Sequence, residues 1–250
     1  HIDRLMYSAK ICDMVIPYSR EQIENACLET LRGNKLDEAY IRPLVYLGPG
    51  ALGLGSRENP VDVIVIAFTW GAYLGDEAHK RGIRAHISTF TRGHLNNTMS
   101  KAKLSGQYIN SVLAKREVVS IGYDEAIMLD SQGCVAEGTG ENIFMVYHGR
   151  LYTPPLSMPI LDGITRDAVL TLAKENGIEV VEQSFTRDML YAASEVFFTG
   201  TACEVTPVRE IDKNVVGTGE PGPITRKLQT AFMAMVKGGN DSHPEWLAYL

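Results

Sequence analysis

The chain has 250 residues, of which 45% are hydrophobic and 22% charged, so it can form one large hydrophobic core or two modest ones. Its formal net charge is −6 and it has no conspicuous Lys/Arg cluster, which argues against binding to nucleic-acid phosphates. The longest apolar stretch, 63–68, is too short to cross a bilayer. We therefore expect a cytoplasmic protein with no membrane partner.

The cysteines and histidines of the chain form no recognisable metal motif. No Cys-x-x-Cys pair and no His-Glu-x-x-His run occurs, and the four cysteines are widely separated. We expect no metal site, and we expect reduced, buried thiols at Cys12, Cys27, Cys134 and Cys203.

The N-terminal part of the chain predicts two helices followed by two strands. The first helix is amphipathic and contains Arg4, and the second begins at the capping box Ser19–Gln22 and ends at Gly33. Runs rich in β-branched and aromatic residues predict strands at 40–47 and 61–68.

A glycine pattern between these two strands matches Gly-x-Gly-x-x-Gly at Gly48, Gly50 and Gly53. A dinucleotide-binding turn of this pattern opens a helix whose N-terminus binds the pyrophosphate. Here the pattern leads into the strand 61–68, so we expect a loop and not a nucleotide site.

The rest of the chain mixes strands and helices after the glycine-rich segment 71–75. Strands are expected at 85–90, 126–130, 134–137, 142–147, 150–153, 196–199 and 204–208, and helices at 108–121, 165–175, 187–193 and 223–237. Tight turns separate the four strands from 126 to 153, which predicts a meander. The layout indicates an α+β fold with a small α/β domain (1–69), a linker (70–77) and a large domain (78–250).

Three features of the large domain are suited to binding a phosphorylated aldehyde such as pyridoxal phosphate. Lys101 and Lys103 supply amines, and a lysine in an apolar site has a lowered pKa and attacks carbonyls as the free amine. Glu137 supplies an acid, and the amides of Ile164 and Thr165 open a predicted helix, where anions are favoured. Spacing alone leaves open that the lysines are surface charges, that Glu137 is a turn residue and that Thr165 is only an N-cap.

Several motifs, taken together and in order, resemble those of the branched-chain amino acid aminotransferases. They are Tyr40-Ile-Arg42-Pro-Leu, Trp70-Gly-Ala-Tyr73-Leu-Gly, the Lys103 segment, residues 124–130, Glu137-Gly-Thr-Gly-Glu-Asn142, Gly163-Ile-Thr-Arg-Asp167 and Gly200-Thr-Ala-Cys-Glu204-Val-Thr-Pro. This family belongs to the class IV, or fold type IV, pyridoxal-phosphate enzymes, and the likeness extends over residues 1–236. It implies that the small domain is incomplete at its N-terminus, because family members have roughly fifty residues before the first helix.

The resemblance implies a role for each ionisable group near the cofactor ring. Lys103, which lies five residues before Tyr108, is the lysine that binds the cofactor aldehyde. Tyr108 donates toward the ring hydroxyl oxygen, and Glu137 faces the pyridine nitrogen, whereas Glu141 is expected to be structural.

The resemblance also implies how the phosphate and the substrate are bound. The phosphate ligands are the amides of Ile164 and Thr165, the hydroxyl of Thr201 and the guanidinium of Arg4. The substrate-binding residues are Tyr40, Arg42, Trp70, Tyr73, Thr201 and Ala202. Alternation along a strand places the first two on one face.

The implied activity is transamination, in which a branched-chain L-amino acid (leucine, isoleucine or valine) and 2-oxoglutarate give a branched 2-oxo acid and glutamate. Tyr40 and Arg42 argue against the same-fold alternatives, a D-amino acid transaminase or an aminodeoxychorismate lyase. A non-catalytic fragment is a further alternative, because the small domain is expected to be incomplete. A homodimer or higher homo-oligomer is expected, since the pocket of family members borrows a loop from a neighbouring subunit.

Overall fold

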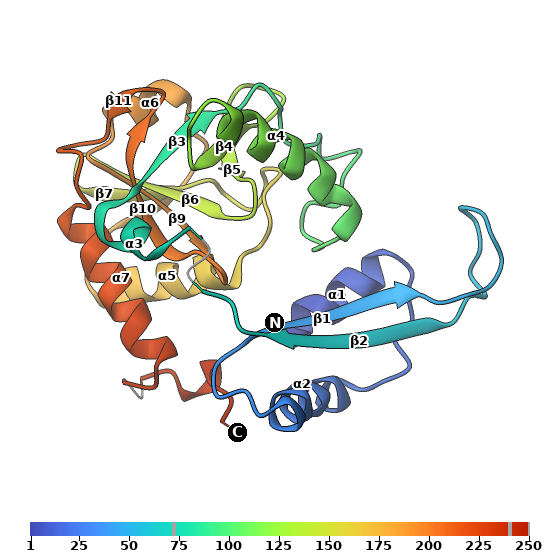
Figure 1. Ribbon diagram of the computed structural model, residues 1–250. Helices are drawn as coiled ribbons and strands as arrows, with labels where there is room; N and C mark the ends of the chain where they lie inside the picture. The colour runs from blue at the N-terminus through green and yellow to red at the C-terminus, as the bar shows by residue number, and fades with distance from the viewer. Residues whose placement is uncertain (72–73, 240–241, 250) are drawn as a thin grey trace. The chain divides into compact units, whose positions relative to one another are not determined.

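The computed structural model describes residues 1–71, 74–239 and 242–249, which fall into two compact units (Figure 1). The first unit comprises residues 1–71, the short segment Ala102–Leu104 and Tyr249. The second unit contains the rest of the described chain. In these described parts, no helix combines the length and the apolar composition that a membrane span requires.

The first unit consists of two helices and a hairpin. Helices α1 (Ile2–Ile11) and α2 (Arg20–Asn34) precede the antiparallel strands β1 (Tyr40–Leu47) and β2 (Val61–Phe68). The predicted capping box is confirmed, because the Ser19 hydroxyl accepts from the Gln22 amide and the Gln22 side chain accepts from the Ser19 amide. The predicted stop at Gly33 is slightly wrong, since Lys35 ends the helix in the left-handed conformation with φ 52°.

The second unit is built on one mixed sheet. Its strands are β3 (Ile83–Ile87), β4 (Glu125–Leu129), β5 (Val135–Gly138), β6 (Asn142–Tyr147), β7 (Arg150–Thr153), β8 (Val180–Glu182), β9 (Glu195–Gly200), β10 (Glu204–Ile211) and β11 (Asn214–Val215). Hydrogen-bonded neighbours follow the order β5-β4-β3-β10-β9-β6-β7-β8, with β11 paired to β10. Parallel pairs occur beside antiparallel ones, which agrees with the expected α+β class.

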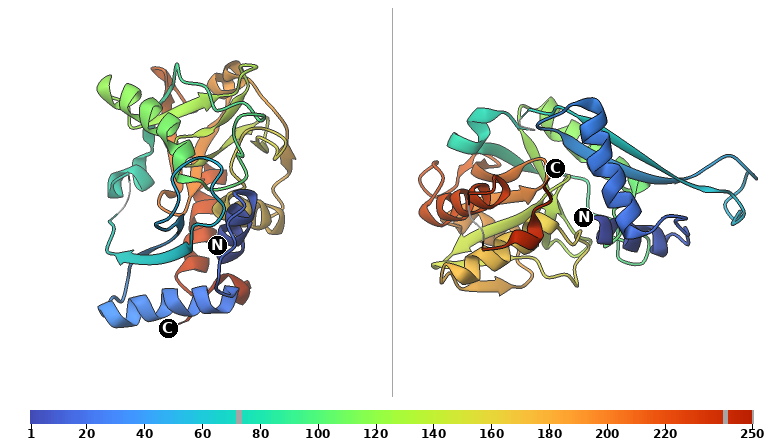
Figure 2. Two further views of the ribbon diagram at one scale, coloured as in Figure 1. Left: turned by 90° about the vertical axis from the view of Figure 1, so that its right-hand side faces the viewer. Right: turned by 90° about the horizontal axis from the view of Figure 1, so that it is seen from below.

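Two helices cover one face of this sheet. Helices α5 (Ile164–Glu175) and α7 (Pro223–Val236) lie side by side and bury a core that includes the stacked rings of Phe144 and Phe197, 5.1 Å apart (Figures 1 and 2). The remaining helices of this unit are α3 (Asp76–Arg81), α4 (Tyr108–Ser120) and α6 (Arg187–Ala192), with short 3-10 turns at Ser105–Gln107 and Pro244–Trp246.

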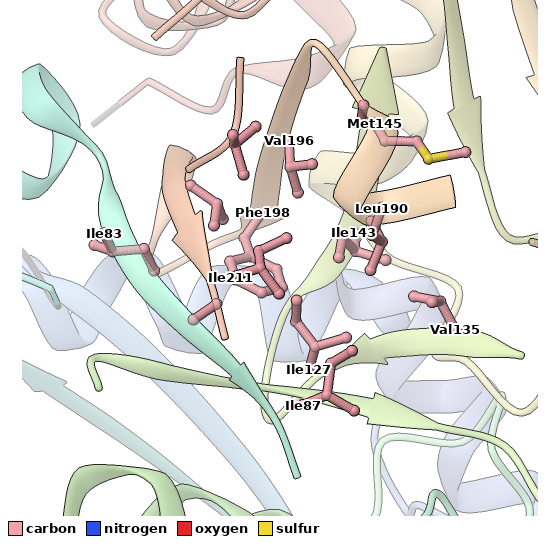
Figure 3. Packing of buried hydrophobic residues seen from close by; sticks show 14 of the residues in the cluster. Ile83, Ile87, Ile127, Val135, Ile143, Met145, Leu190, Val196, Phe198 and Ile211 are labelled. Atoms are coloured by element: carbon pink, nitrogen blue, oxygen red, sulfur yellow. The ribbon is translucent and has the colours of Figure 1, made fainter. Parts of the chain in front are cut away.

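A second core lies on the opposite face. Figure 3 shows Ile127, Ile143, Phe198 and Ile211, from four different strands, pointing toward one another. Because apolar side chains fill both faces, the strands are held firmly and their ends can position polar groups.

The predicted meander is wrong at one connection. β4 pairs with β5 and β6 with β7, but β6 pairs with β9 and not with β5. The Gly138 amide donates to the Glu141 carbonyl and closes a turn between β5 and β6, after which β6 joins β9. Tertiary packing of Phe144 on Phe197 favours this partner over the preceding strand.

Smaller departures concern short elements and one thiol. Helix α3 and strand β8 lie where no element was expected, because six and three residues carry little periodic signal. All four cysteines are free, as expected, but Cys12 is exposed and Cys134 is only partly buried.

Candidate active site

The two lysines that precede α4 have different surroundings. The Lys101 ammonium donates to the carbonyls of Met158 and Ile160 at 2.8 and 2.7 Å, and burial lowers its pKa although the carboxylates of Glu137 and Asp162 oppose that shift. Lys103 is exposed, and its backbone amide donates to the Ser8 hydroxyl at 2.9 Å within the first unit. The ammonium of half-buried Lys101 is therefore hydrogen-bonded to two backbone carbonyls. The family pattern selects the other lysine, Lys103.

Glu137 is a buried carboxylate at the end of β5 with ligands on both oxygens. Its Oε1 pairs with Nη2 of Arg92 at 2.6 Å, and its Oε2 accepts from Asn142 Nδ2 at 3.1 Å and from the Leu161 amide at 3.0 Å. Its side chain is 5% exposed, so these contacts compensate for the lost hydration of the charge. Sequence reasoning assigned no role to Arg92 or Asn142, because neither residue is near Glu137 in a pattern that predicts contact.

Glu141 lies four residues further on, and its environment is different. Burial, with the neighbouring Glu125 carboxylate, raises the pKa of Glu141 to about 8. Its Oε2 accepts from the Gly140 amide at 3.0 Å, whereas Glu125 is bound by Lys115 at 2.6 Å and by the Thr139 hydroxyl at 2.7 Å. Glu141 therefore carries its proton near neutral pH.

The N-terminus of α5 has an open set of donors. Its N-cap is Gly163, which has no side chain, so the N-cap residue supplies no acceptor to the amides of Ile164 and Thr165. Thr165 is not the N-cap but a buried residue inside the helix. A Cβ atom at Gly163 would lie 1.9 Å from Oδ1 of Asn142, so only glycine fits there without a shift.

Helix α7, on the same face of the sheet, provides a contrast. The Glu195 carboxylate, at the start of β9, accepts from the Ile224 amide at 3.1 Å and from the amide and hydroxyl of Thr225 at 2.7 and 2.6 Å. An internal anion thus occupies the N-terminus of α7. The N-cap of α5 is also a glycine, whose missing side chain leaves the first amides of that helix suited to an external anion.

The far end of β9 adds hydroxyl groups. Thr199 pairs with Asn142 across the β6–β9 register, and its buried hydroxyl has no hydrogen-bond partner within the described chain. Thr201 and Ala202 follow in the turn before β10, with Thr201 exposed and Ala202 partly buried. A buried hydroxyl without a partner, on the residue paired with Asn142, suits an external hydrogen-bonding group.

The first unit brings together the predicted arginine of α1 and the lysine segment. The Ser8 hydroxyl donates to the Arg4 carbonyl at 2.7 Å and accepts from the Lys103 amide. Ser8 was not expected to matter, because its role depends on a segment almost one hundred residues away in sequence.

The predicted substrate residues of this unit form a cluster around one cation. The Arg42 guanidinium lies 5.3 Å from the ring centre of Tyr40 and 5.8 Å from those of Phe68 and Trp70. The expectation that Tyr40 and Arg42 share a face of β1 is confirmed by this contact. Tyr73 lies outside the described residues, and Tyr108 is the half-buried first residue of α4.

The second unit contains polar groups suited to two parts of pyridoxal phosphate, its phosphate and its ring nitrogen. The α5 amides and nearby hydroxyls suit a phosphate, and the buried Glu137 suits a protonated ring nitrogen. The chemistry of these groups therefore fits the cofactor.

Comparisons with known proteins agree with this geometry. Residues 1–211 match the family model for amino-transferase class IV. A branched-chain-amino-acid aminotransferase of Pseudomonas aeruginosa is 51% identical over 98% of this chain and 80% of its own length. The crystal structure of the Escherichia coli branched-chain amino acid aminotransferase matches with a TM-score of 0.97 and 44% identity over 100% of this chain and 82% of that one.

The branched-chain amino acid aminotransferase of Thermobaculum terrenum, whose crystal structure is of the PLP form, gives a TM-score of 0.92 and 34% identity over 99% of this chain and 80% of the other. The resemblance inferred from the motifs is confirmed, and so is the two-domain type of fold it implied. The chain belongs to the class IV aminotransferase family.

Proposed function

We propose that the protein transfers amino groups from branched-chain L-amino acids to 2-oxoglutarate with pyridoxal phosphate as cofactor. The observation that carries the proposal is the 51% identity, over 98% of the chain, to an enzyme named for this reaction. The buried carboxylate of Glu137 and the glycine-capped start of α5 support it, because they match the cofactor's two polar ends.

The cofactor-binding roles follow from the chemistry of each group. When bound, pyridoxal phosphate supplies a protonated ring that withdraws electrons from the substrate Cα. The Glu137 carboxylate holds the proton on the ring nitrogen, and Tyr108 donates to the ring hydroxyl oxygen. The amides of Ile164 and Thr165, with Arg4 and the Thr201 hydroxyl, bind the phosphate.

Lys103 is the proposed catalytic residue. Its amine would hold the cofactor through the aldehyde, and as a free amine it would move a proton at the substrate Cα. Tyr40 and the amides of Thr201 and Ala202 bind the substrate α-carboxylate. Trp70 lines the apolar pocket for the substrate side chain.

Arg42 is proposed to bind the distal carboxylate of glutamate or 2-oxoglutarate, together with Tyr73. A pocket that also takes leucine must accommodate this arginine without a carboxylate partner, which costs free energy if the cation is left bare. The three rings around the guanidinium supply a compensating contact, because a cation over an aromatic face is stabilised by about 0.5–2 kcal/mol.

A homodimer is proposed as the working assembly. Helix α4 exposes a row of large apolar residues, among them Ile109 at 64% and Val119 at 53%, and such patches are typical of interfaces. Size-exclusion chromatography at several concentrations tests the dimer, and a concentration-independent monomer would contradict it.

We also propose a cytoplasmic location, which suits the four free cysteines.

The activity is tested with purified protein, added pyridoxal phosphate, L-leucine and 2-oxoglutarate. We expect formation of glutamate and an absorbance band of the bound cofactor, and we expect Lys103→Ala to abolish both. Lys80→Ala is the matched control, because this lysine is exposed on α3. D-alanine is the comparison donor: faster turnover with it would favour a D-amino acid transaminase, and a colourless, inactive wild type would overturn the proposal.

A further inference from the structure

A loop between β7 and α5 is held by two cations from another part of the chain. Three consecutive buried carbonyls, those of residues 158–160, accept hydrogen bonds from charged side chains. Lys101 Nζ donates to the Met158 and Ile160 carbonyls at 2.8 and 2.7 Å. Arg92 Nε donates to the Pro159 carbonyl between them at 3.5 Å. Buried carbonyls need partners, so the two cations determine where this loop lies.

The next residue of the loop contacts the Glu137 carboxylate. The Leu161 amide donates to Oε2 of Glu137, and the Leu161 carbonyl accepts from Asn142 Nδ2 at 2.9 Å. Met158 and Ile160 pack against Ala136, the residue before the glutamate. A displacement of the loop would therefore displace the carboxylate or break its hydrogen bonds.

The same loop leads directly into the helix that is suited to the phosphate. Gly163, the N-cap of α5, follows Leu161 by two residues, and it lies so close to Asn142 that an added Cβ would be 1.9 Å from Asn142 Oδ1. The spacing between Glu137 and the first amides of α5 thus depends on residues 158–161. These are the groups proposed to bind opposite ends of one rigid cofactor, so their spacing matters for its affinity.

Lys101 also anchors the segment that carries Lys103. The chain leaves the second unit after Lys101, and Ala102–Leu104 belongs to the first unit. The Lys101 side chain is bound in one unit, and two residues later the Lys103 amide is bound by Ser8 in the other. Lys101 is thus the last residue of the second unit before this segment, and its side chain is bound within that unit.

We infer that Lys101 is a positioning residue for the cofactor: its ammonium fixes the 158–161 loop, which holds Glu137 and the start of α5, and fixes the base of the segment that carries Lys103. The inference rests on the proposed function. It gives a role to the lysine that the family pattern does not select, and it predicts that the hydrogen bonds of Lys101, and not its reactivity, are what the protein needs.

The test compares Lys101→Met, which keeps the apolar stem but removes the donors, with Lys101→Arg, which keeps donors and charge. Lys115→Met is the matched control, because it removes a lysine from another buried ion pair, 2.6 Å from Glu125. Each protein is titrated with pyridoxal phosphate, with fluorescence quenching for the dissociation constant and absorbance spectra across pH for the bound cofactor. Thermal melts of the cofactor-free proteins are recorded in parallel.

We expect Lys101→Met to weaken cofactor binding on the order of tenfold or more, because two hydrogen bonds from a charged donor are lost. The pH dependence of the bound cofactor's absorbance should change with it. Lys101→Arg should recover most of the affinity, and Lys115→Met should lower the melting temperature without changing the dissociation constant. Equal cofactor affinity and spectra in wild type and Lys101→Met would overturn the inference, whereas a wild type that binds no cofactor would overturn the proposed function itself.

A measurement on the wild type covers the case in which Lys101→Met does not fold. Hydrogen exchange should show the Leu161 amide as strongly protected in the cofactor-free protein, because it is bound to Glu137 in a fixed loop. Free exchange of that amide would contradict the inference. Lys101→Gln, whose shorter amide cannot reach both carbonyls, should give an intermediate protection and an intermediate affinity.

Discussion

Substitution of Gly163 by alanine tests whether Asn142 couples the start of α5 to Glu137. The added Cβ would lie 1.9 Å from Asn142 Oδ1 and 3.1 Å from its Cγ. The backbone at Gly163, with φ −81° and ψ 130°, suits any L-residue, so the effect is steric and not conformational. Asn142 must move, and its Nδ2 then leaves the Leu161 carbonyl and Glu137.

The cost follows from the bonds that this movement breaks. Two buried hydrogen bonds, one of them to a carboxylate, together contribute about 2–3 kcal/mol, and the alanine N-cap adds a few tenths. For a domain of this size, about 2–3 kcal/mol corresponds to a fall in melting temperature of roughly 5–10 °C. We expect weaker pyridoxal phosphate binding as well, because the carboxylate and the helix start are both disturbed.

The assay is a double-mutant cycle of thermal or urea unfolding with Gly163→Ala, Asn142→Ala and the double variant. Since Asn142→Ala removes the clashing atoms, Gly163→Ala should cost at most a few tenths of a kcal/mol in that background, a coupling of about 2–3 kcal/mol. Gly140→Ala serves as the control, because that glycine is exposed and has open space around its Cβ position. The reasoning is refuted if Gly163→Ala costs the same in both backgrounds or costs nothing in the wild type.

Two further substitutions test buried carboxylates. Glu195→Ala should destabilise the protein by about 3–5 kcal/mol in urea unfolding, because it leaves three donors of α7 without an acceptor; a loss no larger than that of the exposed Glu220→Ala would contradict this role. Glu141 keeps its proton in the folded state up to about pH 8, above its unfolded pKa of 4.5, so the folded protein binds more protons and its stability falls as pH rises through that window. Glu141→Gln should therefore remove part of that decline, at most about 1.4 kcal/mol per pH unit, and unchanged pH dependence of unfolding would show that Glu141 is ionised.

Local patterns predicted the strands well where composition and turns agree. The strands at 40–47, 61–68, 142–147 and 150–153 have the bounds expected from β-branched and aromatic runs between glycine, proline and tight turns. The order of those strands was not predictable in the same way. β6 joins β9, more than fifty residues away in sequence, because packing decides between partners that local patterns do not distinguish.

In the candidate site, too, local features were predictable from sequence, whereas contacts between distant residues were not. The glycine-capped start of α5 follows from local helix rules, and its open amides were expected from sequence. Arg92, Asn142 and Ser8 were not singled out, because each acquires its role from a partner brought close only by the fold. Lys101 was passed over because the family spacing to Tyr108 selects Lys103, and only the contacts of Lys101 with two distant carbonyls explain why it is half-buried.

Lys103, and not Lys101, is proposed to bind the cofactor aldehyde. Borohydride reduction of the protein with pyridoxal phosphate converts that bond into a stable amine, and peptide mass spectrometry then locates the modified lysine. Our account predicts the phosphopyridoxyl group on Lys103 alone. Modification of Lys101 in its place, or of no single lysine, would contradict the account.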